Sequence, residues 1–398
     1  MPAIHRSAAA AVLAAGTLLA VTACGPDGPS GGGGTAAPPP SPGVSASASA
    51  SGGGSGSGAI GGITLPTGLP TGLLDGLPKS WDDLTKWKFE DWDNWASKHV
   101  FNNPIVKDFW NPDKMGDSKP ADPAPPTAKP ADDAGVTDPE PPVVKAVPVP
   151  RPYTKQPSGK VFFSAEGGRG NCSATVVQDP AHPGKSNLVW TAGHCVHPGK
   201  GGSYFKDLVF VPAYNNSGAS SGGKKAPLAE LAPLGTWWAK DVVTSPQWLV
   251  EGGETGDAAN QYDFAIMRVS NQNDTGKSLE ETVGGAVPVW FDAPRDKLSV
   301  TAVGYPLYKP FDGQELYKCE GGKPTRLSFD PKRPSMLTVG CNMTQGSSGG
   351  GWFAPMPDGK LALVSNTSIG TQDHTSLSGP YLQTVAKQAL DWIANKKK

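Results

Sequence analysis

Short hydrophobic runs, separated by turn-forming residues, dominate the second part of the chain. Runs rich in apolar residues recur at positions 161–163, 174–177, 188–190, 208–211, 264–267, 298–303 and 361–364, with Gly, Pro and Asn between them. Many short strands with this punctuation are typical of an all-β sandwich or barrel. The final stretch, residues 382–393, instead places apolar residues at i, i+3, i+4 and i+7, which predicts an amphipathic C-terminal helix.

The first residues have the pattern of an export signal. In residues 1–23 a basic start precedes an apolar run at 8–21. This run is short against the ~20 residues that cross a bilayer, so a signal peptide is favoured over a spanning helix. The stretch Val21-Thr22-Ala23-Cys24 resembles the bacterial lipobox, whose cysteine is acylated and becomes the mature N-terminus. We predict a lipid on Cys24; a conventional signal peptide, cut near Ala23, is the alternative.

Two low-complexity stretches are predicted to be spacers between the other parts of the chain. Residues 24–58 are rich in Gly, Ser and Ala, which predicts a long disordered tether, and residues 116–158 are rich in Pro, which predicts a stiffer extended linker. Neither stretch carries enough apolar surface to offset the entropy of ordering it. The remainder, residues 159–398, is long enough to bury a sizeable core.

A tryptophan-rich insert, residues 59–115, lies between the two spacers. Ser80-Trp81-Asp82-Asp83 predicts a capped helix start, and Leu84, Trp92 and Trp95 follow Trp81 at spacings compatible with one helical face. Two interpretations stay open. The insert is a pro-segment or docking helix that covers the domain at residues 159–398 or binds the cell envelope, or it is a marginal helix with no specific contact.

Composition and charge narrow the function only slightly. The 398 residues include 51 Gly and 41 Pro, and 37% are apolar, below the roughly 45–50% (counting Gly) of globular chains. Much of the chain is therefore expected to lie outside any core. A net charge of −1 gives no electrostatic reason to expect nucleic acid or an anionic membrane as a partner.

A histidine, an aspartate and a serine stand in an order that predicts nucleophilic catalysis. His194 ends the apolar run at 188–190 within Thr191-Ala192-Gly193-His194-Cys195, so it is the candidate base. Asp263 starts another apolar run, where a buried carboxylate needs a partner such as His194; Asp257 is a weaker rival. A nucleophile that follows both residues in the chain would complete such a set.

Ser348 is the candidate nucleophile. It lies in Gly346-Ser347-Ser348-Gly349-Gly350, where glycines allow a sharp turn that points the amides of Gly346 and Ser348 into one oxyanion hole. The chain order His, Asp, Ser is that of the chymotrypsin-type triad. The sequence therefore predicts hydrolysis of peptide bonds.

The four remaining cysteines allow three pairings. Cys172 with Cys195 would tie a strand to the segment that carries His194, and Cys319 with Cys341 would close the loop that leads to Ser348. We predict these two disulfides, in an oxidising compartment outside the cytoplasm. A zinc site is the alternative, and the lack of a Cys-x2-Cys spacing argues against it.

These motifs resemble the chymotrypsin-fold serine peptidases, in particular secreted bacterial trypsin-like members related to the glutamyl endopeptidases. The resemblance covers about residues 159–394 and rests on Cys172-Ser173, Thr191-Ala192-Gly193-His194-Cys195, Tyr262-Asp263-Phe264-Ala265, Gly304-Tyr305-Pro306, and Gly346-Ser347-Ser348-Gly349-Gly350 with Trp352. It implies an all-β fold of two six-stranded antiparallel Greek-key barrels, a C-terminal helix, and a triad in the cleft between the barrels.

Two positions depart from trypsin. Ser347 replaces the aspartate that pairs with a newly freed N-terminus, so that activation switch is not expected here. Asn342, beside Met343, replaces the aspartate of the specificity pocket, so a preference for basic residues is not expected; these two residues are the candidate specificity pocket. The stretch Val364-Ser365-Asn366 lacks the histidine of the glutamyl endopeptidases.

The resulting prediction is a monomeric serine endopeptidase that is exported and acts on polypeptides. It needs no cofactor and no metal, binds no nucleic acid, and contacts the membrane only through the lipid on Cys24, if it is not simply secreted. Two other functions stay open: an inactive binding module that keeps the fold, and an esterase that uses the same triad.

Overall fold

The computed structural model describes residues 59–60, 63–64, 76–127, 130 and 137–397. The predicted signal peptide, Cys24 and the Gly/Ser-rich tether all lie outside the described residues. The chain divides into Met1–Ser55 and Gly56–Lys398, and every described residue belongs to the second unit. Within the described part, no helix is both long enough and apolar enough to cross a membrane.

The first half of the peptidase region is a closed barrel of six antiparallel strands. The strand order is β6-β5-β8-β9-β10-β7, and the pairing of β7 with β6 closes the ring. Closure leaves the barrel strands without a free edge, apart from the start of β6, which the short strand β3 covers. The strands are β5 (Ser158–Ala165), β6 (Gly168–Val177), β7 (Leu188–Thr191), β8 (Lys206–Pro212), β9 (Trp237–Thr244), β10 (Ala265–Asn271) and β3 (Lys119–Pro120).

The second half consists of two antiparallel sheets around one shared core. One sheet has the order β16-β15-β11-β12-β4 and the other β13-β14-β18-β17. Their inward side chains, including Ala302, Val339 and Trp352, form a single buried cluster. The strands are β4 (Val147–Pro148), β11 (Val300–Gly304), β12 (Tyr317–Gly322), β13 (Thr325–Leu327), β14 (Met336–Gly340), β15 (Gly351–Pro355), β16 (Leu361–Asn366), β17 (Ile369–Gly370) and β18 (Ser376–Gly379).

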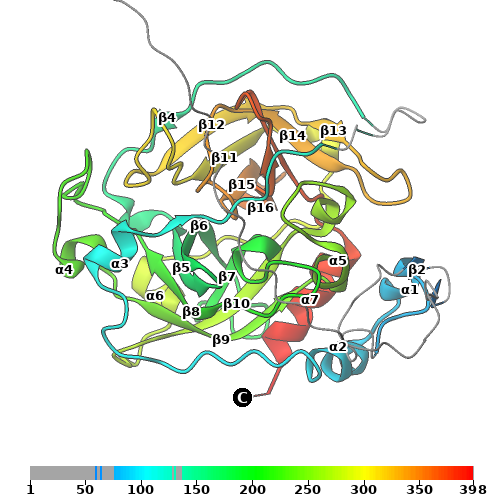
Figure 1. Ribbon diagram of the computed structural model, residues 1–398, viewed down its shortest axis with the longest axis horizontal. Helices are drawn as coiled ribbons and strands as arrows, with labels where there is room; N and C mark the ends of the chain where they lie inside the picture. The colour runs from blue at the N-terminus through cyan, green and yellow to red at the C-terminus, as the bar shows by residue number, and fades with distance from the viewer. Residues whose placement is uncertain (1–58, 61–62, 65–75, 128–129, 131–136, 398) are drawn as a thin grey trace, which may run out of the picture. The chain divides into compact units, whose positions relative to one another are not determined.

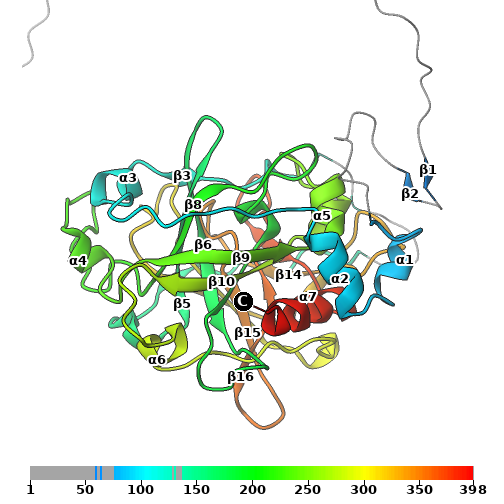
Figure 2. The same cartoon turned by 90° about the horizontal axis from the view of Figure 1, so that it is seen from below.

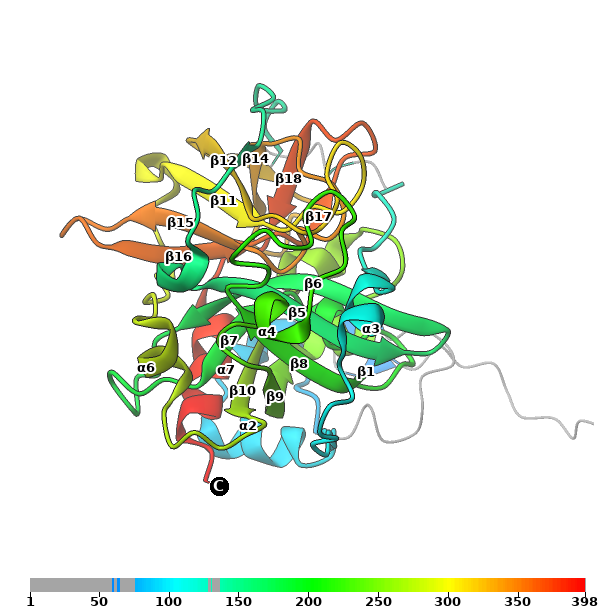
Figure 3. The same cartoon turned by 90° about the vertical axis from the view of Figure 1, so that its left-hand side faces the viewer.

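The predicted mostly-β fold with a C-terminal helix is confirmed, and the two halves lie one above the other (Figures 1 and 3). The hydrogen bonding of the second half divides into two sheets, and the chain passes from one to the other, from β16 to β17, through Thr367 and Ser368. The Thr367 N–H donates to the Gly350 carbonyl, and the Ser368 hydroxyl donates to Asp263 in the first half.

Helix α7 (Thr384–Asn395) is the predicted amphipathic C-terminal helix. Its apolar face, which includes Val385, Ala389 and Ile393, is buried in one cluster with side chains on the outer face of the first barrel, among them Trp238 and Ile266. The helix packs against β9 and β10 of that barrel. The remaining short helices of the peptidase region are α4 (Leu228–Leu231), α5 (Pro246–Glu251) and α6 (Leu279–Val283).

The tryptophan-rich insert is packed on the first barrel and on α7 (Figure 2). Its helices are α1 (Trp81–Leu84), which Ser80 caps as predicted, α2 (Phe89–Ala96) and α3 (Pro112–Gly116), and the short strands β1 (Ala59–Ile60) and β2 (Ile63–Thr64) precede them. Trp92 and Trp95 are both 1% exposed and join the main core cluster. The Gln388 amide of α7 donates hydrogen bonds to the carbonyls of Thr85 and Trp87, at 2.7 and 2.9 Å. The insert therefore makes specific contacts with the peptidase.

The described parts of residues 116–158 also lie against the peptidase, which differs from the extended linker that composition predicts. Asp138 accepts hydrogen bonds from the Arg326 guanidinium at 2.8 and 3.0 Å, and β4 pairs with β12. Residues 119–127 cross between the two halves, visible as the cyan segment that leaves α3 in Figure 1. A proline-rich stretch has little core of its own, and here a folded surface supplies its partners.

We predict that the insert unfolds together with the barrel. Trp92→Ala leaves a cavity in the shared core and should lower the free energy of unfolding by about 3 kcal/mol or more, in one transition of urea denaturation. Phe89→Ala, at a site 39% exposed on the same helix, is the control and should cost far less. Unchanged stability in Trp92→Ala, or a separate transition for the insert, would contradict this arrangement.

Candidate active site

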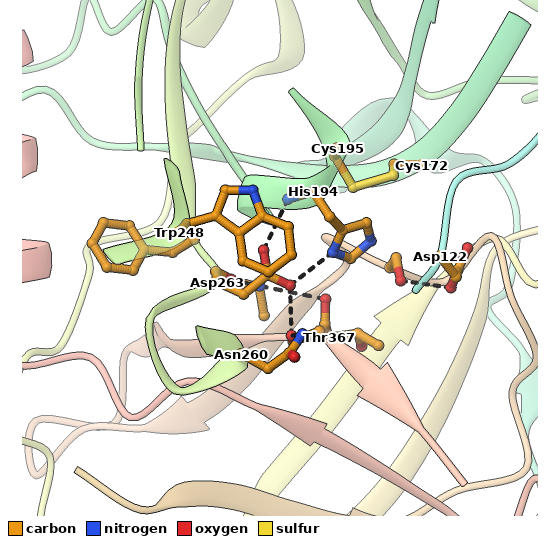
Figure 4. Close-up of polar contacts among 12 residues, drawn as sticks. Asp122, Cys172, His194, Cys195, Trp248, Asn260, Asp263 and Thr367 are labelled. Atoms are coloured by element: carbon orange, nitrogen blue, oxygen red, sulfur yellow. Dashed lines mark hydrogen bonds and ion pairs between the residues drawn. A yellow bond between two sulfur atoms is a disulfide. The ribbon is translucent and has the colours of Figure 1, made fainter. Parts of the chain in front are cut away.

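The backbone around His194 is held by strand pairing and a disulfide. β7 pairs with β6 on one side and with β10 on the other, and the chain then turns through a short 3₁₀ helix, Gly193–Cys195. Cys195 is bonded to Cys172 of β6, as predicted. His194 is 3% exposed, so its imidazole has little freedom to leave the site. Figure 4 shows this disulfide directly beside the histidine.

Asp263 holds the imidazole in place. Its Oδ2 lies 2.7 Å from His194 Nδ1, and its Oδ1 accepts the backbone N–H of His194 at 2.9 Å. The Ser368 hydroxyl donates a further hydrogen bond to Oδ2, at 2.5 Å. This approach requires a glycine at position 193, because a Cβ there would lie 2.9 Å from Asp263 Oδ1.

The rival aspartate has a different place in the fold. Asp257 caps the 3₁₀ helix Ala258–Tyr262, where its side chain accepts the Ala259 N–H at 2.7 Å. That helix ends directly before Asp263 and delivers it to the start of β10. Asp263, not Asp257, is therefore the carboxylate that the fold brings to His194.

Carboxylates control the charge of His194. Burial of the imidazole lowers its pKa, but the nearby carboxylates of Asp263 and Asp122 outweigh burial and raise the pKa above its ordinary value of 6.5. A protonated imidazole is the form that appears when a base accepts a proton from a serine. The site therefore stabilises the charge that such a transfer creates.

The loop that carries Ser348 turns sharply and is held in place by hydrogen bonds from Ser173. Gly346 and Gly349 have φ values of 95° and 75°, which side chains disfavour. The Ser173 hydroxyl donates to the Gly346 carbonyl at 2.9 Å, and the Ser173 N–H donates to the Ser348 carbonyl at 2.7 Å. The predicted disulfide between Cys319 and Cys341 is present on the approach to this loop.

The neighbouring serine, Ser347, points away from the cleft. Its hydroxyl donates to the Thr344 carbonyl at 2.8 Å, and its side chain packs under Gly304. Ser348 is therefore the serine whose hydroxyl faces the cleft, in agreement with the sequence prediction.

Asp122 is a component of the site that sequence reasoning missed. Its Oδ1 accepts the Ser348 hydroxyl at 2.6 Å, and its Oδ2 accepts the Gly346 N–H at 3.0 Å. In Figure 4 the imidazole of His194 lies between Asp263 and Asp122. Asp122 belongs to the proline-rich stretch, where no motif marks it, so only the folded chain reveals this contact.

This contact changes the state of the nucleophile. Because the Ser348 hydroxyl donates to Asp122, it does not donate to His194, and His194 Nε2 is buried with no hydrogen-bond partner among the described residues. Burial raises the pKa of Asp122 above its ordinary value, although His194, the Ser348 hydroxyl and the Gly346 N–H partly offset this by favouring the carboxylate. The nucleophile and the base are thus close in the fold but not bonded to each other.

The two residues of the predicted specificity pocket, Asn342 and Met343, lie in different surroundings. A hollow of about 20 Å³ beside the serine loop is lined by Met343 and by other side chains, which include Thr344, Thr371 and His374. Pro123, the buried neighbour of Asp122, also lines it. Asn342 does not line this hollow; its amide oxygen accepts the Ala146 N–H at 2.7 Å. Its side chain is thereby used to hold the segment that leads into β4.

Metal-ligating residues approach one another at one point of the described chain. Ligand atoms of Cys172, His194 and Cys195 lie within 4.8 Å of one another. The two sulfur atoms are joined in a disulfide, so the group offers the imidazole as its one free ligand.

Solved structures that resemble this chain include bacterial serine proteases. A thermostable serine protease, AL20, from an extremophilic microorganism is 34% identical, with a TM-score of 0.49, and the match covers 62% of this chain and 100% of that one. The protease Anisep from Arthrobacter nicotinovorans is 31% identical, with a TM-score of 0.50 and coverage of 63% and 100%. A Glu endopeptidase in complex with MPD is 17% identical, with a TM-score of 0.45 and coverage of 66% and 100%. No protein-family model and no curated protein matches the chain.

The match to Anisep spans that whole protein at 31% identity. The chain therefore belongs to the bacterial trypsin-like serine proteases, as the sequence motifs predict. It is a serine peptidase of the chymotrypsin fold.

We predict that Asp263 sets the pKa of His194. Asp263→Asn removes the largest favourable charge on the imidazole, so the His194 pKa should fall, as measured by NMR titration of labelled histidines. Because the folded-state pKa is raised, the stability from protonated His194 is complete below its ordinary pKa of 6.5 and is lost as pH rises through the raised value. Unfolding free energies of Asp263→Asn should lack this dependence.

Asp257→Asn is the matched control for this titration. Its carboxylate bonds to Ala259 within its own turn, so the His194 pKa should stay unchanged. A lowered His194 pKa in Asp257→Asn, with none in Asp263→Asn, would reverse the assignment of the two aspartates.

Proposed function

We propose that the protein is an extracytoplasmic serine endopeptidase that cleaves polypeptides through an acyl-enzyme on Ser348. One observation carries the proposal: the Asp122 carboxylate bridges the Ser348 hydroxyl and the Gly346 N–H. One carboxylate oxygen lies beside the nucleophile, and the other lies where the oxyanion of a tetrahedral intermediate would bind. A single small group can therefore meet both the nucleophile and an oxyanion donor, as acyl transfer requires.

In the proposed mechanism, His194 Nε2 takes the proton of the Ser348 hydroxyl as the Ser348 oxygen attacks the scissile carbonyl carbon. The Gly346 and Ser348 amides stabilise the resulting oxyanion, and Asp263 holds the imidazole and balances its charge. His194 then gives the proton to the leaving amine as the C–N bond breaks. Water then attacks the acyl carbon while His194 takes its proton, and His194 returns this proton to the Ser348 oxygen as the ester bond breaks and the acid leaves. The unpartnered Nε2 is the atom that this mechanism needs once Asp122 has left the Ser348 hydroxyl.

The proposed location is outside the cytoplasm, with a lipid on Cys24 as the link to the membrane. Two disulfides in the described chain support an oxidising compartment. The lipobox-like stretch at residues 21–24 supports lipidation, and it lies outside the described residues.

We predict that Ser348 is required for hydrolysis. Because Asp122 holds its hydroxyl, the assay uses Asp122→Ala as well as the wild-type chain. In the Asp122→Ala background, Ser348→Ala should lower the peptide hydrolysis rate by about 10⁴-fold or more and abolish fluorophosphonate labelling. Ser347→Ala is the control and should keep most of the activity, because that hydroxyl faces Thr344. Equal hydrolysis with and without Ser348 would sink the assignment, and hydrolysis of esters but not peptides would favour an esterase.

We predict that Cys24→Ser releases the protein from the membrane fraction or leaves an uncleaved precursor, since the acyl group would have no thiol to occupy. Cell fractionation and the mass of the mature N-terminus measure this. A variant that fractionates and is processed as the wild-type chain is would refute lipidation and favour simple secretion.

A further inference from the structure

A segment of the chain itself occupies the active-site cleft. We call residues 117–126 the cleft strap. At one end β3 pairs in parallel with Gly170 and Asn171 of β6. At the other end the Ala124 N–H donates to the Glu254 carbonyl at 2.6 Å, and the Gly256 N–H donates to the Ala124 carbonyl at 3.0 Å. The strap is therefore hydrogen-bonded to the first half of the enzyme on both sides of Asp122.

Between these two attachments, Asp122 is hydrogen-bonded to the groups that would attack and bind a substrate. Its carboxylate accepts the Ser348 hydroxyl and the Gly346 N–H, and Pro123 lies in the lining of the small hollow beside the serine loop. Charge-assisted hydrogen bonds of this kind are stronger than neutral ones. The imidazole of His194, whose charge the site favours, lies beside the same carboxylate.

The strap is placed as an occupant of the cleft and not as a peptide about to be cut. Cleavage requires a backbone carbonyl carbon about 3 Å from the serine oxygen, with its oxygen on the oxyanion donors. Here a side-chain carboxyl group fills both positions, and it carries no amine that could leave as a peptide bond breaks. The Ser348 proton is also directed at Asp122 instead of His194 Nε2, so attack lacks its base.

The residues before the cleft strap anchor it to the first barrel, which gives the strap a high effective concentration at the active site. Trp110 is 2% exposed, packs its ring at a tilt against Phe162 of the barrel, and donates its indole N–H to the Asp207 carbonyl at 2.6 Å. The Asn103 amide accepts the Leu208 N–H and donates to the Leu208 carbonyl, at 3.0 and 2.9 Å. An inhibitory group tethered through such contacts competes with substrate at an effective concentration that free peptide does not reach.

We infer that residues 76–127 are an inhibitory segment of this peptidase, with Asp122 as the group that blocks Ser348 and the oxyanion hole. The inference rests on the proposed function, since it assigns an occupant to that same site. The interaction surface is the substrate cleft, and its partner is the protein's own N-terminal segment. The active form is then the one in which the strap has left the cleft.

The test measures Ser348 reactivity in full-length variants. Asp122→Ala removes both hydrogen bonds to the site, so the second-order rate constant of fluorophosphonate labelling and the rate of peptide hydrolysis should rise by about tenfold or more over the wild-type chain. Asp122→Asn keeps the shape but loses the charge, and should give a smaller rise. Asp117→Ala is the matched control: it removes a carboxylate from the same strap that faces Arg169 and is mostly exposed, and both rates should stay near the wild-type values.

A second variant releases the strap without altering Asp122. Ala124→Pro removes the N–H that donates to Glu254, so it should raise the labelling and hydrolysis rates as well. This variant, with Asp122→Asn, decides the question if Asp122→Ala does not fold.

The outcomes separate the two claims. Equal labelling of Ser348 in the wild-type, Asp122 and Ala124 variants overturns the inhibitory segment and leaves the peptidase intact. No labelling of Ser348 in any folded variant overturns the proposed function itself. Faster labelling in the Asp122 and Ala124 variants, with the Asp117 control unchanged, supports both.

Discussion

The structure depends on the pairing of one buried carboxylate. Asp263 is fully buried, and an ionised carboxylate in such a position is costly unless every oxygen is bonded. His194 satisfies it from the first barrel and Ser368 satisfies it from the second half of the molecule. The Asn366 amide adds a hydrogen bond to the Asp263 carbonyl at 3.1 Å. The hydrogen bonds that stabilise this one carboxylate therefore join the two halves at the place where the cleft forms.

A second carboxylate competes for the proton that matters to the chemistry. Asp263 lies on one side of the imidazole and Asp122 on the other, with Ser348 bonded to Asp122. Both carboxylates favour a charged His194, but only Asp263 does so without using the nucleophile. A protonated imidazole cannot act as a base, so Asp122 weakens the triad both by holding the Ser348 hydroxyl and by stabilising the wrong charge state of His194.

The segment that delivers Asp122 shows how a chain with little core of its own becomes ordered. Residues 76–127 bury Trp92, Trp95 and Trp110 against the first barrel and α7. Large aromatic side chains gain much from burial, which offsets the entropy of ordering the polar and proline-rich residues around them. The tryptophans therefore account for the ordering of the strap, although they lie outside the cleft.

The sequence by itself determined the strand-rich fold, the C-terminal helix, the capped start of α1, and the identity of His194, Asp263 and Ser348 as candidates. These features are local: apolar periodicity, a capping pattern within four residues, and motifs in which Gly or Cys flanks a reactive residue. The two disulfides also followed, although from a choice among three pairings. The tertiary structure alone decided that Asp257 caps a turn, that Asn342 faces Ala146 instead of the hollow, and that Asp122 occupies the cleft. The last contact joins a residue of the proline-rich stretch to one 226 positions further along the chain, and no local pattern encodes a contact that depends on where a folded surface places its donors.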